Sequence, residues 1–255
     1  MAENEVLLYE IRESVVTLTL NRPDKRNALN AELIEALKAG LTRAAQDPQV
    51  KVVVLRAAGA DFCAGMDLAQ LQRIAQLSLL ENRADAAQLA ALYRQFRHTP
   101  KPIIAAVHGR ALAGGAGLAA SCDLVLATRS AQFCFTETRL GFVPAMVAAI
   151  ARRNLTEKQA FEVLTLAKPF TAEQALAYGF INRVCDDDEL ENALAEFVND
   201  VTRVSASAVQ LTKSLLYQTD AMTFDQAIQH GAEVNAIARM TPDCQAGVAK
   251  FLNKS

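Results

Sequence analysis

The sequence has little that would let it bind a polyanion or enter a membrane. Its 26 Lys and Arg residues are balanced by 28 Asp and Glu residues, which gives a formal net charge of -2 at pH 7. No positive field is therefore available to hold a nucleic-acid backbone or an anionic membrane surface. The longest uncharged apolar stretches, such as 103–107 and 111–120, are too short to cross a bilayer core of about 30 Å. We therefore expect no nucleic-acid partner and no membrane association.

Cysteine and histidine are also scarce. The five cysteines are an odd number without a Cys-x-x-Cys pair, and the three histidines lie far apart without the spacing of metal ligands. This pattern favours reduced thiols over a disulfide framework, and it indicates no metal site. The first five residues lack the basic region and apolar run of a signal peptide, so we expect a cytoplasmic protein. The Gly-x-Ser-x-Gly signature of serine hydrolases and the phosphate-binding P-loop are absent as well.

What the sequence does have is the composition of a globular protein, with 51% hydrophobic and 21% charged residues. Helical spacing of apolar residues after Asn30, a plausible N-cap, predicts a helix that ends before Asp47-Pro48. A long segment without glycine or proline, 68–97, is expected to be mostly helical. Runs rich in β-branched residues predict strands at 6–11, 15–20, 50–55, 103–107 and 124–127. The alternation indicates an α/β fold.

The last third of the sequence has a different pattern of apolar residues. It shows helical spacing almost throughout, with one β-like run at 180–184. The helices are expected at 156–167, 172–178, 189–204, 205–218 and 224–239. No Ser/Gly-rich linker separates this part from the rest. We therefore predict one continuous unit, with an α/β core at about 1–200 and a helical C-terminal region at about 201–255.

The first stretch that could carry chemistry is 62–68, a turn of small residues between a strand and a helix. Backbone N–H groups that are free at the start of a helix can stabilise a developing negative charge. The alternative is a tight structural turn in which Asp67 caps the following helix.

The second stretch is 108–117, in which a strand leads into a glycine cluster and then a helix. It contains the dinucleotide-binding pattern Gly-x-Gly-x-x-Ala at 115–120, with Glu137 twenty residues after Gly117. The surroundings argue against a Rossmann domain, because no helix returns to a second strand between 124 and 137. The glycines can instead let a backbone N–H approach a ligand oxygen closely.

The third stretch, 133–144, places Glu137 after two phenylalanines and before a Gly/Pro loop. A carboxyl group in apolar surroundings favours its neutral form, which suits it to proton transfer. The alternative is a salt bridge between Glu137 and Arg139.

Taken in order, these segments resemble the crotonase superfamily, the enoyl-CoA hydratases and isomerases. The resemblance covers nearly the whole chain and rests on the blocks at 21–30, 63–68, 105–109, 122–123 and 137–144. It implies a crotonase-like (ClpP/crotonase) spiral of ββα units, with a helical C-terminal region that assembles homotrimers, often paired into hexamers. It also implies an acyl-CoA substrate and no separate cofactor, because CoA is part of that substrate.

The resemblance assigns roles to individual residues. The backbone N–H groups of Met66 and Gly114 would polarise the thioester carbonyl as an oxyanion hole, and Glu137 would act as acid and base. The positions matched to the substrate path are Arg26, Ala28, Ala64, Asp67, Leu68 and Gly117.

The sequence departs from typical hydratases at position 117. These enzymes have two glutamates in the site, but here Gly117 stands where the first would be, and only Glu137 remains. Isomerases of the family use a single glutamate, whereas one carboxylate that holds a water could also hydrate a double bond. The segment 134–145 looks similar to a methylglutaconyl-CoA hydratase-like bacterial branch in which glycine is usual at this position. We therefore expect a hydratase, with isomerase as the alternative, and we expect water or a polar substrate group in the space beside Gly117.

Overall fold

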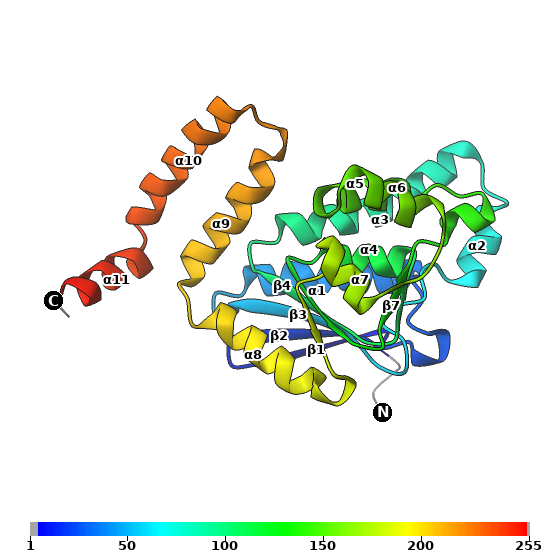
Figure 1. Ribbon diagram of the computed structural model, residues 1–255, viewed down its shortest axis with the longest axis horizontal. Helices are drawn as coiled ribbons and strands as arrows, with labels where there is room; N and C mark the ends of the chain where they lie inside the picture. Colours follow the sequence, from blue (N-terminus) through cyan, green and yellow to red (C-terminus); the bar gives the residue numbers. More distant parts are fainter. Residues whose placement is uncertain (1–4, 254–255) are drawn as a thin grey trace.

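The computed structural model describes residues 5–253 of the chain (Figure 1), so the part of the N-terminal prediction that concerns residues 1–4 lies outside the described residues. Its main feature is a six-stranded sheet in the order β1-β2-β3-β4-β6-β9. β1 pairs antiparallel with β2, and all other neighbours in this sheet are parallel. The strands are β1 Leu7–Arg12, β2 Val15–Leu20, β3 Val52–Ala57, β4 Ile103–Val107, β6 Leu124–Thr128 and β9 Arg183–Cys185.

A second, three-stranded sheet begins shortly after β4 of the first. Its order is β5-β7-β8, with β5 and β7 parallel and β8 antiparallel to β7. These short strands are β5 Arg110–Leu112, β7 Gln132–Cys134 and β8 Phe170–Thr171. Because β5 follows β4 after only two residues, the chain turns from the main sheet into this small sheet directly before the glycine cluster.

The helices cover both sheets and then leave them. α1 buries an apolar face against the sheet, and its N-cap Asn30 accepts a hydrogen bond from the Leu33 amide at 2.9 Å, as the sequence predicts. The helices are α1 Ala31–Gln46, α2 Leu68–Ile74, α3 Leu79–His98, α4 Gly114–Ser121, α5 Ala145–Asn154, α6 Glu157–Thr165, α7 Ala172–Tyr178, α8 Leu190–Thr202, α9 Ala206–Gln218, α10 Phe224–Arg239 and α11 Pro242–Leu252. None of these helices is both long and apolar enough to span a membrane.

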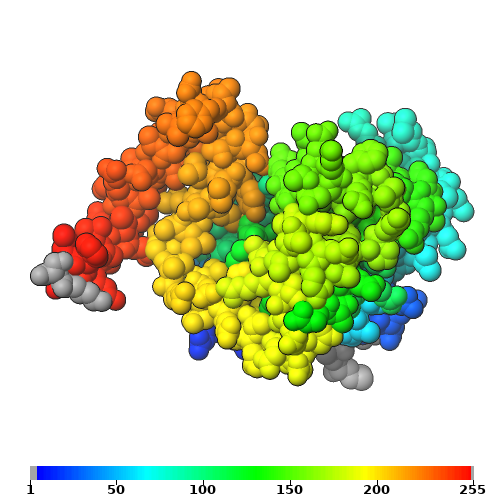
Figure 2. Space-filling view, in the orientation of Figure 1, coloured from blue at the N-terminus to red at the C-terminus, as the bar shows by residue number. Residues whose placement is uncertain are grey.

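The C-terminal helices project from the rest of the molecule. α8 still packs on the main sheet, whereas α10 and α11 contact α9 and extend away from the core (Figures 1 and 2). α9 is fastened to the core by the buried Lys213, whose ammonium donates to Asp123 at 2.7 Å and to the carbonyls of Phe96 and Lys101 at 3.0 Å. The described chain therefore remains attached to the core through α9 and projects from it as α10 and α11. The outermost residues of the two ranges predicted above, 1–4 and 254–255, lie outside the described residues.

Candidate active site

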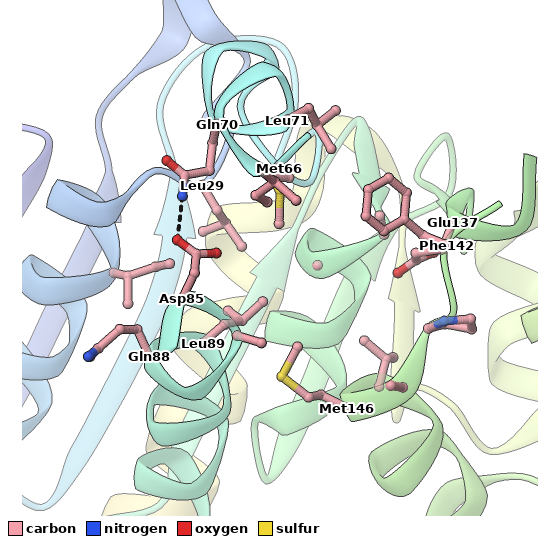
Figure 3. A pocket seen from close by; sticks show the side chains of 18 of the residues that line it. Leu29, Met66, Gln70, Leu71, Asp85, Gln88, Leu89, Glu137, Phe142 and Met146 are labelled. Carbon is pink, nitrogen blue, oxygen red and sulfur yellow. Dashed lines mark hydrogen bonds between the residues drawn. The ribbon is translucent and has the colours of Figure 1, made fainter. Parts of the chain in front are cut away.

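A cavity of about 650 Å³ opens between the α2–α3 segment, the start of α4 and the segment from Glu137 into α5 (Figure 3). Most of its wall is aliphatic or aromatic, and a few polar groups interrupt it, which is the usual character of a small-molecule site. On the α2–α3 side, Gln70 donates a hydrogen bond to Asp85 at 2.5 Å. Five residues predicted from the sequence line this cavity: Ala64, Met66, Leu68, Gly114 and Glu137.

The turn that carries Met66 is held by backbone hydrogen bonds on both sides. The Cys63 amide donates to the Arg110 carbonyl at 3.0 Å, and the Cys63 carbonyl accepts from Leu112 at 2.9 Å. On the other side, Leu29 donates to the Gly65 carbonyl at 2.7 Å, and its own carbonyl accepts from Asp67 at 2.9 Å. The peptides before and after Met66 are therefore fixed.

The turn that carries Gly114 is packed against the first. Ala113 has a positive φ of 46°, an unusual conformation for a residue with a side chain, and its amide donates to the Cys134 carbonyl at 2.7 Å. A Cβ at Gly115 would lie 2.3 Å from the Cys63 carbonyl oxygen, so only glycine permits this approach of the two turns. The strain at Ala113 is thus maintained by contacts on both sides.

Both turns place a backbone amide beside the cavity, that of Met66 and that of Gly114. Among residues 5–253, neither the Met66 N–H nor the Gly114 N–H donates a hydrogen bond to any acceptor. Gly114 is the first residue of α4, where the helix dipole adds partial positive charge. Two preorganised donors of this kind can stabilise an oxyanion that forms between them.

Glu137 begins a short 3-10 helix, Glu137–Leu140, on the opposite wall. Figure 3 shows its side chain directed toward the open middle of the cavity, beside Phe142. Its Oε2 atom is buried and has no hydrogen-bond partner in the part of the chain that the structure describes. Burial raises the pKa of the Glu137 carboxyl above its ordinary value. The alternative of a salt bridge with Arg139 is wrong: within residues 5–253 Glu137 Oε2 has no partner, and the Arg139 guanidinium donates to the Ala167 carbonyl.

Comparison with known proteins identifies the family of this chain. The sequence model of the enoyl-CoA hydratase/isomerase family matches residues 10–255. The chain belongs to the enoyl-CoA hydratase/isomerase family. It is 35% identical over 240 residues to a Thermus thermophilus protein provisionally named an enoyl-CoA hydratase, covering 94% of this chain and 95% of the relative. It is also 29% identical over 259 residues to the 1,2-epoxyphenylacetyl-CoA isomerase of Escherichia coli, covering 98% and 96%.

A solved structure agrees with this assignment. The crystal structure of an enoyl-CoA hydratase from Mycobacterium smegmatis superposes with a TM-score of 0.94 at 34% identity, covering 98% of this chain and 96% of that chain. The expected crotonase-like α/β fold is therefore confirmed. In this member of the enoyl-CoA hydratase/isomerase family, Met66, Gly114 and the partly buried Glu137 thus line one cavity.

Position 117 differs from our expectation. We expected water or a polar substrate group beside Gly117, but the phenol of Tyr93 fills this space, and a Cβ at Gly117 would lie 2.6 Å from its hydroxyl oxygen. Gly117 is buried within α4 and does not line the cavity. The absence of a side chain at position 117 is therefore compensated by a side chain from α3.

The remaining predicted positions lie outside the lining of the cavity, and Arg26 is exposed to solvent. Arg26, Ala28 and Asp67 do not line the cavity. Asp67 caps α2 through the Ala69 amide at 3.0 Å and pairs with Arg22 at 2.8 Å, which is the structural alternative considered for this turn. The Arg26 carbonyl accepts a hydrogen bond from Ala64 at 2.9 Å, so the segment around Arg26 supports the turn that carries Met66.

Two residues that shape the surroundings of the cavity are not identified from the sequence, Asn27 and Tyr93. Asn27 is fully buried, and its amide donates to the carbonyls of Ala58 and Asp61 at 2.8 Å, which joins the loop after β2 to the loop after β3. Tyr93 lines the cavity from α3. The only signal for Tyr93 was an aromatic hydroxyl in a segment otherwise rich in Ala, Leu, Gln and Arg.

Within residues 5–253, no group of three or more His, Cys, Asp or Glu side chains could hold a metal ion.

Proposed function

We propose that this family member is an enoyl-CoA hydratase that uses Glu137 as its only acid and base. The observation that carries the proposal is that Glu137 Oε2 and the Met66 and Gly114 amides, all without a hydrogen-bond partner among residues 5–253, belong to residues that line one mostly apolar cavity. A carboxyl group in this setting is suited to moving protons, and the amides are suited to an enolate oxygen. CoA enters as part of the substrate, and the steps below need no further group.

The reaction follows from this arrangement. The thioester carbonyl oxygen accepts hydrogen bonds from the Met66 and Gly114 amides, which makes C3 of the double bond electrophilic. The Glu137 carboxylate takes a proton from water as the water oxygen bonds to C3, and the displaced electron pair moves to the carbonyl oxygen. The enolate then collapses, and C2 takes the proton from Glu137, so that one water is added. Each amide is worth a factor of about 10² to 10³ in rate.

The names of the relatives support hydration. Besides the Thermus protein, a crotonyl-CoA hydratase of Syntrophomonas wolfei is 30% identical over 252 residues, covering 98% of this chain and 96% of the relative. We assign the CoA part of the substrate to the surface beside Arg26, Ala28 and Ala64, of which only Ala64 lines the cavity, and to Leu68, which lines the cavity and is 77% exposed.

A second candidate is isomerisation of a 3-enoyl-CoA to a 2-enoyl-CoA. The observation that favours it is the Tyr93 phenol, which occupies the place expected for water beside Gly117. In this reaction Glu137 would take a proton from C2 and return it to C4, while the same amides hold the dienolate oxygen. No water is consumed.

The experiment that decides between them uses ¹⁸O-labelled water. Crotonyl-CoA and 3-hexenoyl-CoA are offered separately, and the products are analysed by mass spectrometry, with the Glu137→Gln variant as the control for background reaction. We expect label in a 3-hydroxyacyl product and a higher kcat/KM for the 2-enoyl substrate. Unlabelled 2-enoyl-CoA as the sole product would replace the hydratase proposal with the isomerase.

The assembly is a separate part of the proposal. Large apolar side chains on the projecting helices are exposed in the single chain: Phe224 is 78%, Met240 73% and Phe251 74% exposed. Exposed apolar surface on this scale marks a protein interface. We therefore expect a homotrimer or a hexamer by light scattering. Truncation after Arg239 should lower both the assembly and the activity, and a fully active monomer would contradict this.

A further inference from the structure

The space beside Gly117 is closed by two side chains. A Cβ at Gly117 would lie 2.6 Å from the Tyr93 hydroxyl oxygen, and 3.0 Å from both Tyr93 Cζ and Val147 Cγ2. The separation of 2.6 Å from the hydroxyl oxygen is far inside van der Waals contact, and the two separations of 3.0 Å are tighter than ordinary contacts. Neither of these two side chains can move freely, because Tyr93 is 5% and Val147 4% exposed. A carboxylate at position 117 therefore has no room while Tyr93 is in place.

The same phenol is hydrogen-bonded to Gly114, one of the two residues proposed to form the oxyanion hole. The Tyr93 hydroxyl donates to the Gly114 carbonyl oxygen at 3.0 Å. Gly114 is also the first residue of α4, and its own N–H finds no acceptor in the part of the chain that the structure describes. Burial raises the pKa of Tyr93 well above its ordinary value, so the phenol stays neutral and remains a donor throughout the working pH range. Because glycine has the widest conformational freedom of any residue, a hydrogen bond from another helix restricts the backbone at Gly114.

We propose that Tyr93 is the positioning residue that makes this a one-carboxylate site: its hydroxyl excludes a side chain from position 117 and holds the first turn of α4 so that the Gly114 amide faces the substrate oxygen. This inference rests on the proposed function, because it takes the Gly114 amide as a donor to the thioester. It adds the reason why Glu137 works alone. The phenol of Tyr93 occupies the space that an acidic side chain at position 117 would need. It orients the Gly114 amide and does not transfer a proton.

The first test removes only the hydroxyl, in the variant Tyr93→Phe. The readout is the ratio of the dissociation constants of butyryl-CoA, which has a ground-state carbonyl, and acetoacetyl-CoA, whose enolate resembles the intermediate. Wild type should prefer the enolate, and the variant should lose about fivefold to tenfold of this preference, as expected for one hydrogen bond. The kcat should fall by a similar factor with little change in KM, because the orientation matters most in the transition state.

The matched control is Tyr217→Phe. Its hydroxyl is also hydrogen-bonded, donating to Asp123 at 2.6 Å, but Tyr217 lies on α9 and does not line the cavity. It should lower the thermal stability and leave the enolate preference unchanged. A Tyr93→Phe variant with the wild-type preference and kcat would overturn the positioning role.

The second test is a double-mutant cycle between positions 93 and 117. Gly117→Ala in wild type should lower kcat at least about tenfold, because the new methyl meets the hydroxyl. In the Tyr93→Phe background the closest atom is gone, and the same change should cost about twofold or less. If Gly117→Ala does not fold alone, recovery of soluble protein in the Tyr93→Phe background reports the same coupling. Equal effects in both backgrounds would overturn the steric part.

The outcomes separate this inference from the proposed function. If wild type binds butyryl-CoA and acetoacetyl-CoA equally, the oxyanion hole itself is refuted, and the Tyr93 inference fails with it. If wild type discriminates between them and Tyr93→Phe discriminates equally well, the proposed function stands and only the role of Tyr93 is refuted.

Discussion

The two walls of the cavity are held in different ways. The wall that carries the Met66 and Gly114 amides is fixed by backbone hydrogen bonds, for instance from Cys63 to the Arg110 carbonyl. The wall that carries Glu137 is a single 3-10 turn followed by a loop, in which Phe142 is 43% and Val143 76% exposed. Stabilising a developing charge needs donors that do not move, whereas shaping a substrate tolerates adjustable side chains. The difference suggests that chemistry resides in the first wall together with Glu137, and substrate selection in the loop.

The largest effect is expected from Gly115→Ala, which would break the rigid wall. A Cβ there would meet the Cys63 carbonyl oxygen at 2.3 Å, and because this oxygen belongs to the backbone, the turns must separate. We expect a loss of at least about 3 kcal/mol in the free energy of unfolding, measured by urea denaturation. Gly231→Ala, at a helical position with nothing within 4 Å, is the control and should be neutral or slightly stabilising. Equal stabilities for the two variants would refute the close packing of the turns.

The next effect concerns the pH dependence of the rate. Glu137 acts as a base only when ionised, and burial raises its pKa. The value of kcat/KM should therefore fall about tenfold per pH unit below this pKa, with the midpoint above the ordinary value for glutamate. The profile is measured with crotonyl-CoA at constant ionic strength. A midpoint at or below the ordinary glutamate value would place the active carboxyl outside the buried wall.

A smaller effect is expected in the loop, from Phe142→Ala. The exposed part of this ring faces the cavity, where the acyl chain would cover it. Loss of that contact should raise KM about fivefold with little change in kcat, in keeping with about 1 kcal/mol of apolar burial. Phe161→Ala removes a ring that is 69% exposed on α6 outside the cavity and should leave KM unchanged. A drop in kcat at constant KM would mean that the loop takes part in chemistry.

The smallest effect is on stability, where Glu137→Gln should make the protein more stable. A carboxyl whose pKa is raised by folding stabilises the fold at pH values below its unfolded pKa, and this contribution is lost as the pH rises through the folded pKa. The amide has no charge to bury, so the melting temperature of the variant should exceed that of wild type by about 2–4 °C at pH 7. The gap should close near pH 4. A lower melting temperature at pH 7 would show that Glu137 is a stabilising residue.

The sequence predicts the large elements of this fold well, because their patterns are local. Ile103–Val107 is a strand buried along its whole length, and α1 begins at its predicted cap Asn30. The segment 68–97 was expected to be mostly helical, and it divides into α2 and α3 because Ser78 starts a new helix with a capping box. The short strands β5, β7 and β8 were not predicted, since two or three residues carry no periodicity.

The site was predictable to the extent that it depends on backbone turns. The turns at Met66 and Gly114, and the position of Glu137, follow from glycine placement and family resemblance, and the structure brings them to one cavity. The contact between Tyr93 and Gly117 could not be predicted, because it joins two helices that are distant in sequence and depends on side-chain packing. The sequence therefore shows that position 117 lacks an acidic side chain, but it does not show that Tyr93 fills the space beside it.

The measurement that tests the central claim most directly compares turnover and binding in Glu137→Gln. The substitution keeps the shape of the side chain and removes its ability to accept a proton, so kcat with crotonyl-CoA should fall by about 10² to 10⁴. The dissociation constant of butyryl-CoA should stay within about twofold, because the amides and the apolar walls are unchanged. Glu196→Gln, an exposed carboxylate on α8, serves as the control for the loss of one charge. A Glu137→Gln variant that retains more than about half of the wild-type turnover would contradict the account.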